Sequence, residues 1–237
     1  MGENKIAIVG AGPAGIAAAI QLKRFGFAPD LFEKDIVGGL LWNANLVENY
    51  PGFPGGVSGP DLIQLMKKQL DQFSIDVIYS EIKIIKWSED KYELSSSDGL
   101  RKYDYIIVAS GTKPIITNKM INYQSLIHVN HNIRKLLDSK GKIIIIVGSG
   151  DAAFDQAINL AQSNDIIIIN RGRDCKCLPI LAGNVFSNPR IDYIDETSIS
   201  NVEQINDLGG TETRIKITLQ RRKDTSFIEC DELVFAV

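Results

Sequence analysis

The sequence has few of the residues on which disulfide frameworks, metal centres and membrane spans depend. Its 237 residues include three cysteines and two histidines, which is too few for a disulfide scaffold and leaves a zinc site dependent on distant ligands. The longest aliphatic run, Ile143 to Val147, is far too short to cross a membrane. Because the N-terminus lacks a basic region followed by a long apolar stretch, we expect no signal peptide and a cytoplasmic protein.

An excess of positive charge is lacking too. With 26 Lys and Arg against 29 Asp and Glu, the net charge is −3, which argues against nucleic acid or an anionic membrane as partner. Apolar residues make up 44% and charged residues 23%, as in a globular protein with a sizeable core. The length allows one or two domains.

Glycines are placed in two fingerprints, of which the first opens the chain. An apolar strand, Lys5 to Val9, runs into Gly10, Gly12 and Gly15, and a helix-forming run follows. The first glycine permits a tight turn, the second lets a pyrophosphate approach the backbone, and the third lets the helix pack close to the strand. This order predicts a dinucleotide site at the start of the helix.

An acidic residue completes the first unit. The next strand, Asp30 to Phe32, is followed by Glu33, which lies 23 residues after Gly10, where an acid can accept hydrogen bonds from ribose hydroxyls. We therefore predict that this site takes a nucleotide with a free ribose, as in FAD.

The second fingerprint repeats this pattern. Lys142 to Val147 is a strand, Gly148 and Gly150 form the turn, and Asp151 to Ala161 is a helix with Ala153 in the place of the third glycine. We expect the second nucleotide to lie against Gly148, Gly150, Asp151, Ala152 and Ala153.

The two units differ at the position 23 residues after the first glycine. Counting from Gly148 gives Arg171, with Arg173 two residues further on, where the first unit has Glu33. An arginine there suits the 2′-phosphate of NADPH, whereas an acid suits a free 2′-hydroxyl. The alternative is that both arginines belong to an ordinary solvated loop.

The remaining sequence predicts further elements of an α/β chain. The glycine- and proline-rich stretch Val37 to Pro60 is expected to be an ordered, functional loop. The other expected elements are a helix at Asp61 to Phe73, short strands between Ile75 and Leu94, a turn at Ser95 to Gly99, strands at Asp104 to Ala109, Ile166 to Ile169, Arg214 to Leu219 and Glu229 to Ala236, and a crossover at Pro114.

The loop VENYPGFPGGVSGPDL at Val47 to Leu62 closely resembles the flavin-side loop of low-molecular-weight thioredoxin reductases. Further matches follow in the family's order: GAGPAG, GGLL at Gly38 to Leu41, IIVASGTKP at Ile106 to Pro114 and GSGDAAFDQA at Gly148 to Ala157. The resemblance covers nearly the whole chain. It implies an α/β fold with two Rossmann-like three-layer domains, an FAD domain over residues 1–112 and an NAD(P)H domain over residues 113–237.

The resemblance also implies cofactors and an activity. Hydride would pass from NADPH to FAD and then to an acceptor, in a homodimer. FAD would contact Gly10, Gly12, Pro13, Ala14, Gly15, Glu33, Lys34, Gly38, Gly39, Leu40, Asn49, Ile82, Ser110 and Gly111, and NADPH would contact Gly148, Gly150, Asp151, Ala152, Ala153, Arg171 and Arg173.

The chain departs from the family at several places. The segment before the second fingerprint, residues 121–142, holds no Cys-x-x-Cys pair, so no disulfide relay operates there. The acceptor would then be a ferredoxin or flavodoxin, a small disulfide or a quinone. Leu40 replaces the usual glutamine, and Asn170-Arg171-Gly172-Arg173 replaces His-Arg-Arg.

The family's chains continue past the position that matches Val237 and return to the FAD domain with a Gly-Asp motif. We therefore expect an FAD domain without this return segment. The alternative function is a non-catalytic nucleotide-binding or regulatory protein derived from such an enzyme.

The cysteines and histidines suggest no catalytic residue and no metal site. A disulfide in Cys175-Lys176-Cys177 would close a small, strained and easily reduced ring. We expect reduced loop thiols there instead, and a core position for Cys230. The spacing of His128 and His131 is typical of a helix face or a loop.

Overall fold

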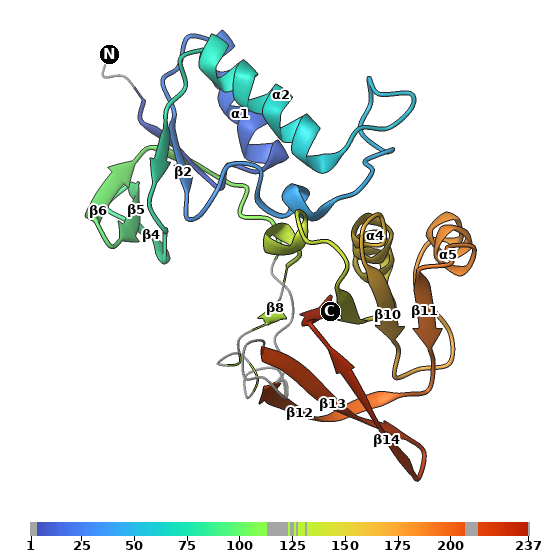
Figure 1. The fold of residues 1–237 in the computed structure, drawn as a ribbon. Helices are drawn as coiled ribbons and strands as arrows, with labels where there is room; N and C mark the ends of the chain where they lie inside the picture. Colours follow the sequence, from blue (N-terminus) through green and yellow to red (C-terminus); the bar gives the residue numbers. More distant parts are fainter. Residues whose placement is uncertain are drawn as a thin grey trace. The chain divides into compact units, whose positions relative to one another are not determined.

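The computed structural model describes residues 4–112, 123, 126, 128–130, 132–206 and 213–236. It divides into two compact units, Met1–Trp42 with Val47–Lys113, and Asn43–Leu46 with Pro114–Val237. Each unit contains one parallel sheet and one three-stranded antiparallel sheet in its described residues (Figure 1), so the predicted α/β class is confirmed. The expected crossover at Pro114 and the side chain of His131 lie outside the described residues.

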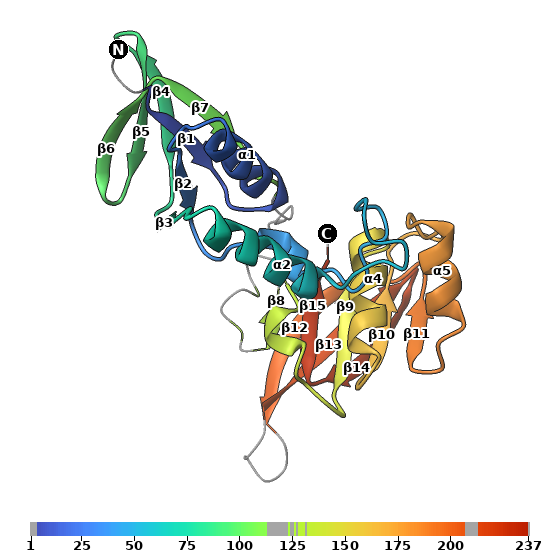
Figure 2. The same ribbon diagram turned by 90° about the horizontal axis from the view of Figure 1, so that it is seen from above.

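The parallel sheet of the first unit has the order β3-β2-β1-β7. Its strands are β1 (Ile6–Val9), β2 (Asp30–Glu33), β3 (Val77–Tyr79) and β7 (Tyr105–Val108). Helices α1 (Pro13–Arg24) and α2 (Gly59–Gln72) lie side by side, as Figures 1 and 2 show. Their apolar faces bury Ile16, Leu62 and Met66 in one cluster with Ile8 of β1, which gives the helical layer of a Rossmann-like unit.

The antiparallel strands form the third layer. They are β4 (Ile84–Ser88), β5 (Lys91–Ser96) and β6 (Gly99–Tyr103). Leu94 and Tyr103 pack with Phe32 of β2 on the sheet face away from the helices. The turn expected at Ser95 to Gly99 is shorter than predicted, because β5 pairs through Ser96 with Gly99 and leaves two residues to reverse the chain.

The long loop after β2 is ordered, as its composition predicts. It contains the short helix η1 (Gly39–Asn43) and a bridge between Val47 and Val57. At its end, the Ser58 hydroxyl accepts a hydrogen bond from Asp61 N–H and caps α2.

The parallel sheet of the second unit has the order β11-β10-β9-β15-β8 (Figure 2). Its strands are β8 (Val129–Asn130), β9 (Ile143–Val147), β10 (Asp165–Ile169), β11 (Ile191–Ile194) and β15 (Glu232–Phe235), accompanied by η2 (Arg134–Leu136), α4 (Asp151–Leu160) and α5 (Pro179–Phe186).

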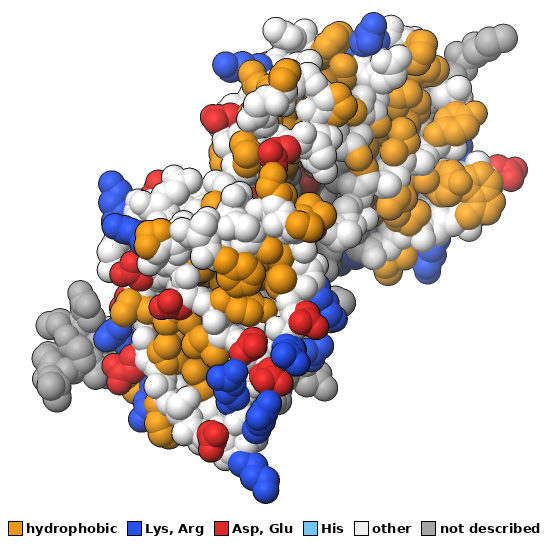
Figure 3. Space-filling view, turned by 90° about the vertical axis from the view of Figure 1, so that its right-hand side faces the viewer, with side chains coloured by type: hydrophobic (Ala, Val, Ile, Leu, Met, Phe, Trp, Pro, Cys, Tyr) orange, Lys and Arg blue, Asp and Glu red, His pale blue; other side chains and the backbone are white. Residues whose placement is uncertain are grey.

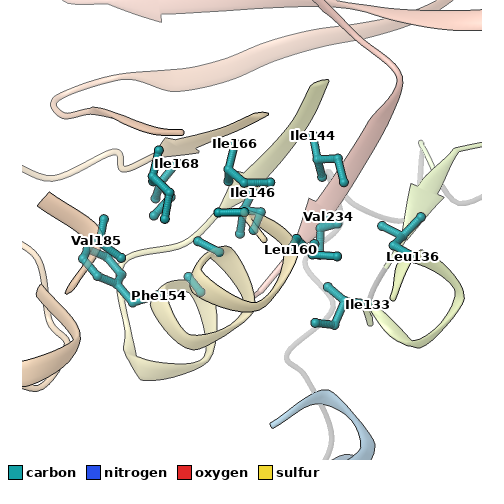
Figure 4. Packing of buried hydrophobic residues seen from close by; sticks show 14 residues of the cluster. Ile133, Leu136, Ile144, Ile146, Phe154, Leu160, Ile166, Ile168, Val185 and Val234 are labelled. Carbon is teal, nitrogen blue, oxygen red and sulfur yellow. The ribbon is translucent and has the colours of Figure 1, made fainter. Parts of the chain in front are cut away.

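Isoleucine-rich strands make the core of this unit. In β9, Ile144 and Ile146 join the cluster around Phe154 of α4 (Figure 4), whereas Ile145 joins the cluster of the antiparallel strands. Successive side chains of a strand point to opposite faces, and both faces of this sheet are covered. The continuous aliphatic run of the sequence therefore forms one short strand buried on both sides.

The antiparallel strands of the second unit form a meander. They are β12 (Ser198–Asn206), β13 (Thr213–Arg221) and β14 (Asp224–Cys230). The single strand expected at Glu229 to Ala236 is wrong, because the chain forms β14 and then β15. At the junction, Asp231 accepts hydrogen bonds from Ile143 N–H at 2.7 Å and from Arg214 Nε at 3.1 Å. Cys230 is buried, as predicted.

None of the helices in the described residues is long and apolar enough to span a membrane.

Helix α5 and strands β11 and β12 were not predicted, since they lie in a stretch whose sequence mixes helix and strand patterns.

Candidate functional site

In each parallel sheet, a central strand leads through a glycine turn into a helix: β1 into α1 and β9 into α4. Gly10 N–H donates to the Phe32 carbonyl at 2.8 Å, and Gly148 N–H donates to the Ile169 carbonyl at 3.1 Å. Gly10 has φ +106° and lies against the Ala109 carbonyl, which a Cβ would overlap; a Cβ on Gly148 would lie 2.5 Å from the carbonyl oxygen of Ala236. Each turn is therefore closed by the residue that follows the neighbouring strand.

The third position of the fingerprint is packed differently in the two units. A Cβ on Gly15 would overlap the Gly10 carbonyl oxygen, so α1 lies too close to its turn for a side chain at this position. In α4 the same position is Ala153, whose methyl group is fully buried. The second helix thus leaves room for a side chain that the first excludes.

The middle glycines face open space. Nothing lies within 4 Å of a Cβ built on Gly12 or Gly150. Both residues are helix N-caps without a capping side chain, in contrast to Ser58 on α2. The first N–H groups of α1 and α4 lack this side-chain acceptor, and the helix dipole adds positive potential there. The two open turns are therefore suited to an anionic group such as a pyrophosphate.

Glu33 is held beside the first turn by the backbone. Its side chain is buried, with Oε2 accepting from Ala11 N–H at 2.9 Å and Oε1 accepting from Lys34 N–H at 2.9 Å and Asp35 N–H at 3.0 Å. These three donors fix the orientation of the carboxylate. Since a carboxylate has about four acceptor sites, it can still accept bonds from ligand hydroxyls.

The residue that corresponds to Glu33 in the second unit is Asn170, so the equivalence predicted for Arg171 is wrong. Val9 pairs with Phe32 in the first sheet, and Val147 pairs with Ile169 in the second. The connection from turn to strand is one residue shorter in the second unit, and counting 23 residues passes the end of β10 by one. Arg171 follows the structural counterpart of the acid.

Asn170 shapes the loop that carries the arginines. Its side chain is 4% exposed, its Nδ2 donates to the Asp174 carbonyl at 3.0 Å and to Tyr193 Oη at 2.8 Å, and its Oδ1 accepts from Gly172 N–H. Arg171 and Arg173 are exposed, and no ion pair involves either guanidinium within the part of the chain that the structure describes. Sequence reasoning named Asn170 only as part of the altered His-Arg-Arg segment and missed Tyr193; the available signal was an amide directly after four isoleucines.

The predicted residues of the first site are partly brought together. Gly38 N–H donates to the Ala11 carbonyl at 2.8 Å, and the Cα of Ser110 packs against Gly10. Gly39, Leu40 and Gly111 are exposed nearby in the chain. Asn49 is exposed in the loop after η1, and Ile82 packs with Phe32 on the sheet face away from the helices.

The helix start of α4 is bound to the loop after β10. Asp151 Oδ1 accepts from Leu178 N–H at 2.8 Å, and the Ser149 carbonyl accepts from Lys176 N–H at 2.7 Å. An acidic side chain therefore stands in the first turn of α4, where α1 has none. The Asp151 carboxylate therefore stands beside the backbone N–H groups at the start of α4, including that of Ala152.

Two cavities lie at the other edges of the sheets. One, of about 680 Å³, is lined by Lys5, Asp30 and Tyr103 in the first unit, and one of about 470 Å³ is lined by His128, Lys142 and Glu232 in the second. These residues stand at the amino ends of the strands, whereas open α/β sheets bind ligands at the carboxyl ends. In the described residues, no three His, Cys, Asp or Glu side chains gather as a metal site would require.

Comparison with known proteins agrees with this architecture. Residues 4–237 match the family described as pyridine nucleotide-disulphide oxidoreductase. The chain is 28% identical to the NADPH-dependent thioredoxin reductase 3 of Arabidopsis thaliana over 234 residues, 94% of this chain and 43% of that protein. It is 26% identical to the thioredoxin reductase of Pneumocystis carinii over 99% of this chain and 75% of that protein.

Solved structures share the fold. The thioredoxin reductase of Lactococcus lactis superposes with a TM-score of 0.84 at 20% identity, and that of T. acidophilum with 0.83 at 24% identity. In both cases 99% of this chain and 77% of the other chain are covered. The two Rossmann-like units and the family match agree, and the chain belongs to the pyridine nucleotide-disulphide oxidoreductase family, in which it is thioredoxin reductase-like.

Proposed function

We propose that this chain is the nucleotide-binding part of an FAD-dependent NADPH oxidoreductase, with FAD on residues 1–112 and NADPH on residues 113–237. Thioredoxin reductases contain FAD and depend on NADPH. The two nucleotides, when bound, supply the transfer of hydride from nicotinamide C4 to flavin N5. The observation that carries the proposal is the pair of glycine turns, each with an open middle glycine at the start of a helix and each beside a different charge.

The residues at the first turn fit FAD. The open face of Gly12 and the N–H groups of α1 would receive the pyrophosphate, and Glu33 would accept bonds from the ribose hydroxyls. Ser110 and Gly38, which lie against the turn, would border the same nucleotide, together with the other residues predicted from the resemblance.

The residues at the second turn fit NADPH. The open face of Gly150 would receive the pyrophosphate, and the exposed guanidinium groups of Arg171 and Arg173 would bind the 2′-phosphate with charge-assisted hydrogen bonds. Asn170 fixes the loop but adds no charge, so it does not oppose that phosphate as a carboxylate would.

The electron acceptor is proposed from what the sequence lacks. Without a Cys-x-x-Cys pair before the second fingerprint, electrons would leave for a ferredoxin or flavodoxin, a small disulfide or a quinone. A homodimer, a cytoplasmic location and the absence of nucleic-acid and membrane partners belong to the same proposal.

The test is to purify the chain and measure flavin absorbance and its response to NADPH without oxygen. We expect about one FAD per chain, which NADPH bleaches and a suitable acceptor restores. A colourless protein that cannot be reconstituted with FAD would contradict the proposal. If such a protein still bound NADPH, it would support the alternative of a non-catalytic nucleotide-binding protein.

A further inference from the structure

Two cysteines lie beside the second nucleotide turn. Cys175 and Cys177 flank Lys176, whose N–H donates to the Ser149 carbonyl at 2.7 Å. Both thiols are partly exposed, and both pack against the core cluster around Phe154. The loop runs on to exposed Leu178 and Ile180; Figure 3 shows apolar patches among charged side chains on the face that carries α5. Because both thiols are partly exposed, a small molecule can reach the pair from solvent.

The two thiols lie close enough to interact electrostatically. Both also lie near Tyr193, and Cys177 lies near Asp151. Burial and the neighbouring Cys175 raise the pKa of the Cys177 thiol to about 11. At neutral pH the Cys177 side chain is therefore a protonated thiol.

We propose that Cys175 and Cys177 are a reversible dithiol–disulfide site that a small disulfide oxidises, and that its oxidation weakens nicotinamide nucleotide binding at the Gly148–Gly150 turn. The second half of this inference rests on the proposed function of that turn. Both cysteines follow β10 in the second unit, on the loop that also carries Arg171 and Arg173.

The exchange proceeds in two balanced steps. Cys175 loses its proton, and its sulfur attacks the small disulfide, whose S–S bond breaks; a mixed disulfide forms, and the thiolate that leaves takes up a proton. The Cys177 sulfur then loses its proton, attacks the Cys175 sulfur and releases the second thiol. The protein loses two electrons and two protons, and the small disulfide gains them.

The coupling to the turn follows from the position of Lys176. A bond between residues two apart closes a small ring that contains both peptide groups of Lys176. Such a ring constrains the backbone and is usually strained, so we expect the Lys176 N–H to leave the Ser149 carbonyl. Losing that hydrogen bond frees the carbonyl of the nucleotide turn. The strain also makes the disulfide easy to reduce, as a reversible site requires.

The chemistry is tested on the full chain by mass spectrometry. The reduced protein is incubated with oxidised glutathione as probe under argon, and free thiols are trapped with an alkylating reagent. After unfolding, we expect the reagent to alkylate one cysteine, the buried Cys230. The peptide that holds Cys175 and Cys177 should contain a disulfide. In Cys177→Ser, glutathione should stay attached to Cys175, and in Cys175→Ser the adduct at Cys177 should form much more slowly. Retention of all three thiols would overturn the site.

The coupling is tested by titrating NADPH into reduced and oxidised protein. We expect oxidation to raise the Kd about fivefold, equivalent to ~1 kcal/mol. The matched control, Cys175→Ser with Cys177→Ser, should bind equally before and after treatment. Equal binding by both forms of the natural chain would overturn the coupling. If even the reduced chain fails to bind NADPH, the proposed function and the coupling fall, while the mass measurement still decides the dithiol site.

Discussion

The two units use the same strand order around their glycine turns, but the strand that closes each turn is covered differently. In the second unit, β15 lies between β9 and β8, and its Leu233 and Val234 are fully buried. In the first unit, β7 is the edge of the sheet among the described residues, with Tyr105 56% and Val108 62% exposed. Both glycine turns form in the described residues, although only in the second unit does a further strand cover the strand that closes the turn.

The charges at the two turns differ as well. The first places a buried, backbone-bonded carboxylate, Glu33, at the end of β2. The second places a buried amide, Asn170, at the matching position. Its charged groups lie outside the strand: the exposed Arg171 and Arg173 are positive, and Asp151 at the start of α4 is negative. Under the proposed function, we expect the first site to favour ligand hydroxyls and the second to favour ligand phosphate.

The largest expected effect concerns the closeness of helix and turn. Gly15→Ala should destabilise the first unit by about 3 kcal/mol, because its methyl group would overlap the Gly10 carbonyl oxygen. The reciprocal Ala153→Gly should cost the second unit only about 1–2 kcal/mol, through helix propensity and a lost buried methyl. Urea unfolding followed by hydrogen exchange in each unit measures both. Equal costs would show that the two helices pack alike.

The next comparison separates the two nucleotides. Gly12→Val and Gly150→Val place side chains in open space, so each should change stability by no more than about 1 kcal/mol. The first should lower FAD affinity and the second NADPH affinity, each about tenfold or more, since the side chain fills the space of a pyrophosphate. Flavin content and NADPH titration provide the readouts. Loss of both nucleotides from either variant would contradict the assignment of one to each turn.

Arg171 tests the charge at the second turn. Arg171→Ala should weaken NADPH binding about tenfold and NADH binding little, because only NADPH carries the 2′-phosphate. Titration of the natural chain and the variant with both nucleotides measures the difference, and Arg173→Ala shows how the two cations share it. An equal loss for NADPH and NADH, or no loss, would show that the phosphate lies elsewhere.

The smallest expected effect concerns Asp151. Asp151→Asn keeps an oxygen for Leu178 N–H but removes a negative charge from the start of α4. NADPH should then bind about two- to threefold more tightly, and the gain should shrink at high salt as charges are screened. Unchanged or weaker binding at low salt would indicate that the carboxylate helps to hold the nucleotide.

Much of the fold could be predicted from local patterns. The glycine turns, both helices that follow them and the strands before them were all predicted, because strand, glycine and helix signals agree over a few residues. Helix α5, β11 and β12 could not be predicted, since their burial depends on neighbours far away in the sequence. The break at Asp231 was missed for the same reason, as its partners are Ile143 and Arg214.

The sequence by itself determined that two nucleotide turns exist and that one unit carries an acid after its second strand and the other arginines, because these features follow from residue types at short spacing. Only the tertiary structure decided which residues correspond. The register of β9 with β10 aligns Asn170, not Arg171, with Glu33, since pairing is fixed by hydrogen bonds between strands and not by distance along the chain. It also decided that the Cys175–Cys177 loop lies on the Ser149 carbonyl, a contact between segments that no local pattern connects.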